Sequence, residues 1–196
     1  MDLPHVSSRR AVLAGALSTG AVGTMLPGAV AVDDLPTNPT SLFFLQIGAI
    51  LGDSISAAHP NTIDVLTWSV GADTTISPFN TGSGLSKSKP RDFTFIARMG
   101  SHSPLIHAAV AKGTRFAKAT LWARRASSGF EYLVITLENV YVTSYALAPS
   151  DSDAAPLDVV RLDFGKITHA YKHQTPTGTI KPVVSTTFDY VNNVAG

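Results

Sequence analysis

Apolar residues recur at strand spacing over most of the chain after residue 41. Six segments show this pattern, at residues 42–47, 63–70, 117–124, 131–147, 159–171 and 183–191. Successive side chains of a strand point to opposite faces, so this spacing predicts strands with one buried face. The alternation changes face near Glu138 and Asn139, which predicts a β-bulge or a strong bend there. We therefore expect a mainly β domain.

One segment between the strands has helical features instead. Ser103 and Pro104 fit an N-cap followed by proline at the first helical position, and Lys112 with Gly113 fits the helix end. A helix this short must pack on the β-structure to persist. Its spacing places four residues on one side, namely Leu105, Ala108, Ala109 and Lys112.

Three segments rich in polar residues, glycine or proline separate these elements. Residues 76–90 and 148–156 form two long loops, and loops of this length in a compact domain are usually functional or disordered. Residues 32–40 have the composition of a short tether. The domain is therefore expected to span residues 41–193.

The first 31 residues have the layout of a cleavable export signal. Ser8, Arg9 and Arg10 precede an uncharged run over residues 11–26. That run is shorter and less hydrophobic than the roughly 20 strongly apolar residues of a membrane-spanning helix. No stable membrane insertion is therefore expected. Paired arginines before such a run indicate a twin-arginine signal, and a secretory signal that happens to contain two arginines is the alternative. The small residues Ala29 and Ala31 predict cleavage after Ala31, and hence a secreted, periplasmic or cell-surface protein.

Charge and cysteine content exclude several classes of function. Removal of residues 1–31 takes away Asp2, Arg9 and Arg10 and leaves 13 basic and 13 acidic residues. A neutral surface offers no field for nucleic acid or anionic lipid, so no nucleic-acid partner is expected. The absence of cysteine in an exported chain excludes disulfides and thiolate chemistry. The remaining 165 residues fit one domain with a packed core.

Three motifs suggest ligand binding, and each has a simpler interpretation. Residues 82–88 resemble a phosphate-binding loop, but Ser86 stands before Lys87 where glycine is needed, so a flexible loop is favoured. His169 and His173 share one strand face without a third metal ligand nearby, so no metal or other cofactor is expected. Trp122 with Arg124 and Arg125 could form a nucleic-acid or sugar platform, but two arginines are too few. We expect Trp122 at a contact between barrel and helix, or between subunits.

The chain contains the residue types of a catalytic triad, but no motif supports one. Ser101 or Ser103 would have to meet His107 and Asp92, and nothing in the sequence forms a nucleophile elbow. An N-cap serine and an exposed helical histidine explain Ser103 and His107 fully. We therefore expect a protein that is not an enzyme.

Taken in order, the motifs of the domain resemble a known family. They are Phe44-Leu45-Gln46-Ile47 with Gly52, Ile63 to Trp68, Arg91 to Phe95, Ser103-Pro104-Leu105 with Ala108 and Gly113, Ala119-Thr120-Leu121, Tyr132-Leu133 with Leu137 and Val140, Leu162 with Phe164 and Lys166-Ile167, and Tyr171. In this order, over residues 42–193, they resemble the haemolysin-coregulated protein (Hcp) family, the tube subunit of type VI secretion. The resemblance implies a small closed β-barrel with one flanking α-helix that assembles as a homohexameric ring.

The resemblance also implies how rings act. Hcp rings stack into a tube or carry small effectors in the lumen, and the long loop after the second strand helps stacking. Here that loop includes the candidate assembly residues Asp73, Thr74, Thr75, Phe79, Leu85, Lys87 and Lys89. The chain differs from the family in having Phe188-Asp189 where Trp-Asp is usual, and in its signal, because tube subunits lack a cleavable one.

The leading hypothesis is an exported, self-assembling Hcp-like protein that forms rings after export and binds a small partner protein in the lumen. A monomeric secreted barrel that serves as a binding module or cryptic hydrolase is the alternative, because fold does not fix function. A type VI tube subunit whose signal is wrongly predicted is the third hypothesis.

Overall fold

The computed structural model describes residues 41–74, 88–150 and 155–196. All of them belong to one unit of the chain, residues 35–196. The export signal, the tether and most of the loop at 76–90 lie outside the described residues. The elements are β1 (Ser41–Ile47), β2 (Ile63–Asp73), β3 (Lys89–Arg98), α1 (Ser103–Lys112), β4 (Arg115–Arg125), β5 (Glu131–Ala148), β6 (Leu157–Tyr171), β7 (Val184–Asp189) and β8 (Val194–Ala195).

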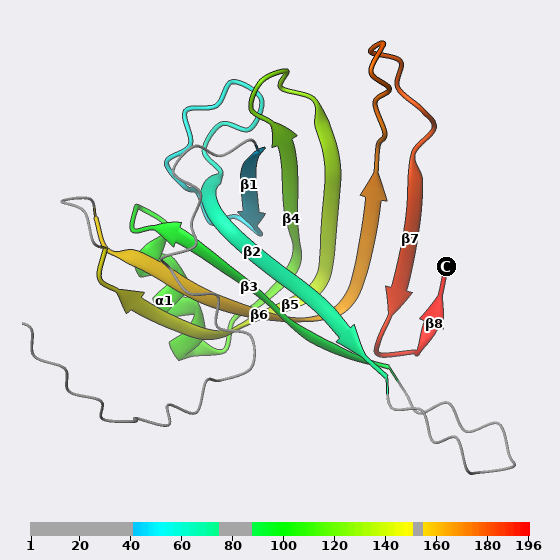
Figure 1. The fold of residues 1–196 in the computed structure, drawn as a ribbon. Coiled ribbons are helices and arrows are strands. Elements are labelled where there is room, and N and C mark those ends of the chain that lie inside the picture. The colour runs from blue at the N-terminus through cyan, green and yellow to red at the C-terminus, as the bar shows by residue number, and fades with distance from the viewer. Residues whose placement is uncertain (1–40, 75–87, 151–154) are drawn as a thin grey trace, which may run out of the picture. The chain divides into compact units, whose positions relative to one another are not determined.

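The strands form one antiparallel sheet that closes on itself. Its order is β3-β2-β1-β4-β5-β6-β7-β8, and β3 also pairs with β6, which closes a ring of six strands (Figure 1). One edge of β6 serves two partners, because β3 pairs with residues 157–162 and β7 with residues 166–171. The predicted closed barrel with one flanking helix is therefore confirmed, and β7 with β8 extends the sheet beyond it.

The hydrophobic pattern alone does not predict β3, nor the two-residue β8. The first residues of β3 are Lys89, Pro90, Arg91 and Asp92, which resemble the end of a polar loop. In its second half Phe93, Phe95 and Ala97 are fully buried in the core. Pairing with β2 keeps the polar half extended, and β6 adds its pairs only from Phe93 onward. The local sequence pattern does not reveal these distant partners.

The predicted change of face in β5 is confirmed as a bend. Buried side chains occupy odd-numbered positions before Asn139 and even-numbered positions after it. Asn139 has a φ of 57°, in the left-handed region that asparagine tolerates better than most residues. The pairing register with β6 stays constant there and shifts only between Val142 and Ser144. A left-handed residue, without an inserted one, therefore turns the strand.

The connection from β1 to β2 is tightly closed near its base. The Gly52 N–H donates to the Asn61 carbonyl at 2.8 Å, and the Ser54 N–H donates to the Thr62 carbonyl at 3.0 Å. A Cβ atom on Gly52 would lie 2.3 Å from the Thr62 carbonyl oxygen. Only glycine therefore allows these two backbone segments to approach so closely.

The helix α1 begins differently from the prediction. His102 occupies the N-cap position, and no side chain caps the helix, so the prediction that Ser103 is the N-cap is wrong. The predicted end is confirmed, because Gly113 has a φ of 62° and its N–H bonds back to the last turn. Ile106 and Ala109 are buried in the core, which fixes α1 against the barrel.

Candidate assembly interface

A cluster of buried polar groups joins α1 to the barrel. The Ser103 hydroxyl donates to Oδ2 of Asp158 at 2.5 Å, and the Tyr145 hydroxyl donates to Oδ1 at 3.0 Å. The Gly100 N–H donates to the Ser103 oxygen at 2.9 Å. His102 Nε2 lies 3.2 Å from Asp158 Oδ2, but the angle is poor, and neither ring nitrogen makes an aligned hydrogen bond with a described residue. Ser103 and Asp158 have no exposed surface.

This cluster is not the catalytic triad that the sequence allowed. The Ser103 hydroxyl bonds directly to a carboxyl group and is closed to solvent, whereas a hydrolytic serine needs a base and access to substrate. No hydrogen bond between described residues joins the other candidates to the Ser103 hydroxyl. The Ser101 N–H bonds to Asp53, the ring of His107 packs on that of Tyr145 in the cluster, and Asp92 accepts a bond from Thr143. The geometry therefore does not support a hydrolase.

A second cluster fixes the loop between β1 and β2 to the barrel wall. The imidazole of His59 lies between two rings, with its centroid 4.7 Å from that of Trp122 and 5.0 Å from that of Phe44. Its Nε2 is 3.2 Å from a carboxylate oxygen of Glu131, which also contacts Lys172 at 3.4 Å. No sequence pattern would have identified His59, because its partners come from three distant segments. The ring of Trp122 thus contacts the loop between β1 and β2, and a contact of Trp122 with another subunit stays a prediction.

Acidification should destabilise the fold through buried histidines. Burial is the main cause that lowers the pKa of His59, His102 and His169 below the ordinary value of about 6.5, and the carboxylates near His59 and His102 oppose it only in part. The folded state then binds fewer protons than the unfolded chain, so this stability is full above pH 6.5 and is lost as the pH falls below it. Urea unfolding at pH 7.5 and 5.5 should show a smaller free energy of unfolding at pH 5.5.

A matched variant tests the source of this pH dependence. His59→Phe keeps an aromatic ring between Phe44 and Trp122 but removes one titrating group, so its loss of stability between pH 7.5 and 5.5 should be smaller. A free energy of unfolding that rises on acidification would contradict the prediction.

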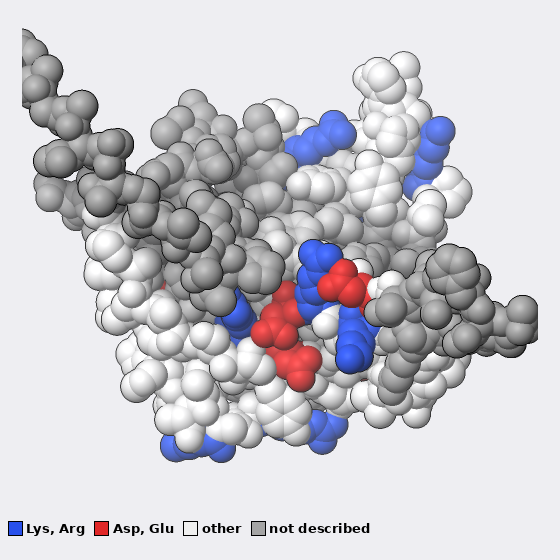
Figure 2. All heavy atoms as spheres, turned by 60° about the horizontal axis from the view of Figure 1, so that its bottom comes forward, with Lys and Arg blue, Asp and Glu red and all other residues white. Residues whose placement is uncertain are grey.

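The remaining candidate ligand sites gain no support from the structure. In the part of the chain that is described, no three histidine, aspartate or glutamate side chains are grouped for a metal, and His173 lies beyond the end of β6 while His169 lies within it. One face of Trp122 is taken by His59. On the face turned forward in Figure 2, acidic and basic side chains lie side by side, so that face has no field of one sign for nucleic acid. Residues 82–87 of the phosphate-loop motif lie outside the described residues.

The strand β7 presents an open edge. It pairs with β6 along its whole length, but its other edge is covered only from Thr187 to Asp189, by β8 and Gly196. Among the described residues, nothing pairs with the outer edge from Val184 to Ser185. The Thr187 N–H and C=O point outward to Gly196, so alternation also points those of Ser185 outward. Unpaired edges of this kind pair readily with another strand.

The strand β2 has a second open edge. It pairs with β1 only at Ile63 to Val65, although it continues to Asp73. Within the described ranges, no strand covers that edge from Leu66 onward. Towards its end, Asp73 forms a two-point ion pair with Arg91 of β3 at 2.5 and 2.7 Å, which holds the stem of the predicted assembly loop together. Of that loop's candidate residues, Asp73, Thr74 and Lys89 are described, while Thr75, Phe79, Leu85 and Lys87 lie outside the described residues.

Apolar side chains are exposed around the open edge of β7. Four valines near the C-terminal hairpin are more than half exposed, at Val183, Val184, Val191 and Val194. A group of exposed apolar residues beside an open strand edge is typical of a contact with another chain.

Comparison with known proteins identifies the family. A family model described as the type VI secretion system effector Hcp matches residues 44–171. The chain belongs to the Hcp family. Protein hcp1 of Pseudomonas aeruginosa is 30% identical over 138 residues, which are 69% of this chain and 85% of that protein. The resemblance that the sequence motifs indicated is thus confirmed.

Solved Hcp structures share the fold. Hcp1 from Salmonella typhimurium has a TM-score of 0.67 and 26% identity, over 81% of this chain and all of that one. A type VI secretion system effector from Yersinia pestis has a TM-score of 0.61 and 27% identity, over 75% of this chain and 98% of that one. The chain is therefore a type VI secretion tube-like protein, from a family of structural proteins and not of enzymes. No helix in the described part of this Hcp chain is long and apolar enough to cross a membrane.

Proposed function

We propose that this Hcp protein works by assembling with copies of itself into rings, with a hexamer as the ring size. The open edges of β2 and β7 carry the proposal, since they are two different surfaces of one chain. Two different surfaces that bind each other in successive copies make a head-to-tail contact, which closes into a ring when the rotation allows it. The exposed valines at β7 would be buried in that contact.

The proposal includes export before assembly. Arg9 and Arg10 ahead of the mild apolar run favour the twin-arginine route, which transports folded chains, with cleavage after Ala31. A cysteine-free barrel needs no oxidative folding outside the cytoplasm and suits that route. Rings would then form after export, with the loop from Asp73 to Pro90 helping them to stack and a small protein held in the lumen.

Size-exclusion chromatography with light scattering on residues 32–196 tests ring formation. We expect a discrete oligomer, with a mass six times that of one chain for a hexamer, because both open edges are present in this segment. A strict monomer at micromolar concentration would remove the ring proposal. Mass spectrometry of the exported protein tests the signal: we expect a chain that starts at Val32, and retention of Met1 would favour a tube subunit without its own signal.

A further inference from the structure

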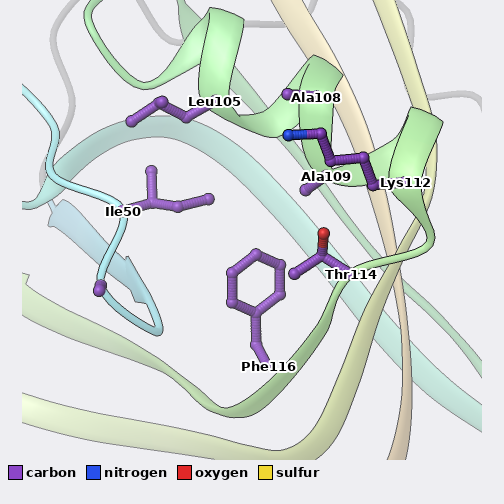
Figure 3. Close-up of a pocket in the computed structure, with 8 residues that line it drawn as sticks. Ile50, Leu105, Ala108, Ala109, Lys112, Thr114 and Phe116 are labelled. Atoms are coloured by element: carbon purple, nitrogen blue, oxygen red, sulfur yellow. The ribbon is translucent and has the colours of Figure 1, made fainter.

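An apolar groove lies between α1 and the turn that follows β1. Its volume is about 310 Å³, and it is open to solvent on one side. Figure 3 shows the ring of Phe116 below the groove, Ile50 on one side and α1 above it, with the Lys112 side chain extending along the helix. The lining residues are Ala49, Ile50, Leu105, Ala108, Ala109, Lys112, Thr114 and Phe116.

The groove is suited to a side chain from another protein. Leu105 on its wall is 50% exposed, and Leu51, next to the lining residue Ile50, is 58% exposed. Small-molecule sites usually enclose most of their ligand, whereas this groove is open and continues into exposed apolar surface. One inserted aliphatic or aromatic side chain would cover Leu105 and Phe116 together.

One cationic side chain lies at the groove. Lys112 is the only charged lining residue. The segment from residue 93 to residue 130 holds six lysines and arginines and no aspartate or glutamate, although the chain as a whole is balanced. The ion pairs between described residues include neither Lys112 nor Arg115, and Arg115 donates to the neutral amide of Asn139. A lysine in the last turn also suits the helix dipole, but that does not account for the apolar groove beside it.

We propose that this groove docks an acidic segment of a partner protein, which inserts one aliphatic or aromatic side chain against Phe116 and places a carboxylate near Lys112. Charge complementarity favours an acidic segment over a basic one. An apolar side chain alone would bind equally well whatever the charge of the residues beside it. The proposal does not depend on ring formation, which uses β2 and β7.

Fluorescence anisotropy with the full chain and labelled peptides tests the proposal. The probe is a seven-residue peptide with a leucine-phenylalanine centre flanked by aspartate and glutamate, and its control has lysines in place of those acids. We expect the acidic peptide to bind and the basic one not to bind. Lys112→Glu should weaken binding about tenfold, the effect of losing one charge-assisted contact, and Lys181→Glu, an exposed lysine of the C-terminal region, should leave it unchanged.

A second variant separates the groove from the charge. Ala108→Trp fills the groove and should abolish binding of the acidic peptide while leaving the oligomer mass from light scattering unchanged. Equal binding of both peptides, or unchanged binding by Lys112→Glu and Ala108→Trp, would overturn the proposal. A change in oligomer mass with Ala108→Trp would show that a second copy occupies the groove, and would overturn it as well.

Discussion

Asp158→Ala should lower the free energy of unfolding by about 3 kcal/mol. The carboxyl group accepts hydrogen bonds from Ser103, which like Asp158 has no exposed surface, and from the half-buried Tyr145. Alanine would leave the buried Ser103 hydroxyl without an acceptor, at a cost of roughly 1–3 kcal/mol, and would also remove the bond from Tyr145. Because Ser103 belongs to α1 and Tyr145 to β5, the loss should also loosen the helix from the barrel. Urea unfolding followed by circular dichroism at pH 7.5 measures it.

Two variants calibrate this result. Asp163→Ala changes an exposed aspartate of the same strand and should alter stability by less than about 0.5 kcal/mol. Asp158→Asn retains one acceptor oxygen, so its free energy of unfolding should lie between those of Asp158→Ala and Asp163→Ala. If Asp158→Ala were as stable as Asp163→Ala, the cluster would contribute nothing to the attachment of α1.

Ser185→Pro should abolish self-assembly while the barrel stays folded. Proline removes the Ser185 N–H, which points away from β6 on the open edge of β7, so no hydrogen bond within the chain is lost. A strand from a second copy would then meet a missing donor and a pyrrolidine ring at the centre of the contact. Light scattering at micromolar concentration should give the mass of one chain where the unchanged protein gives an oligomer.

Ser185→Thr is the matched control, since it keeps the N–H and favours the extended backbone. It should assemble like the unchanged protein. Circular dichroism should show both variants folded. Urea unfolding should give each a free energy of unfolding within about 1 kcal/mol of that of the unchanged chain. An oligomer of full mass for Ser185→Pro would place the assembly contact elsewhere than on β7.

The sequence predicted the fold well where alternation was strong. The spans expected at 117–124 and 131–147 fall within β4 and β5, and the face change at Asn139 is present as a left-handed residue. Local spacing carries this information, because each strand buries one face against a common core. The four residues placed on one side of the helix do share a side, and together they line the groove.

Features that depend on distant partners could not be predicted. Asp158 lies just before the segment expected to start at residue 159, and its burial requires hydroxyl groups from α1 and β5. His59 gains its position from rings on β1 and β4. A charged or titratable residue in a polar stretch is most often exposed, so only the three-dimensional pairing identifies these exceptions.

The shared edge of β6 has a mechanical consequence. β7 pairs with β6 at six successive residues, on the same edge that β3 uses, and β5 holds the other edge of β6 from Leu133 to Ala148. A pull along β7 therefore loads the ladder between β6 and β7 in shear, while β5 keeps β6 in the barrel. Hydrogen bonds loaded in shear must break together and not one after another. The C-terminal hairpin should therefore resist being pulled off the barrel.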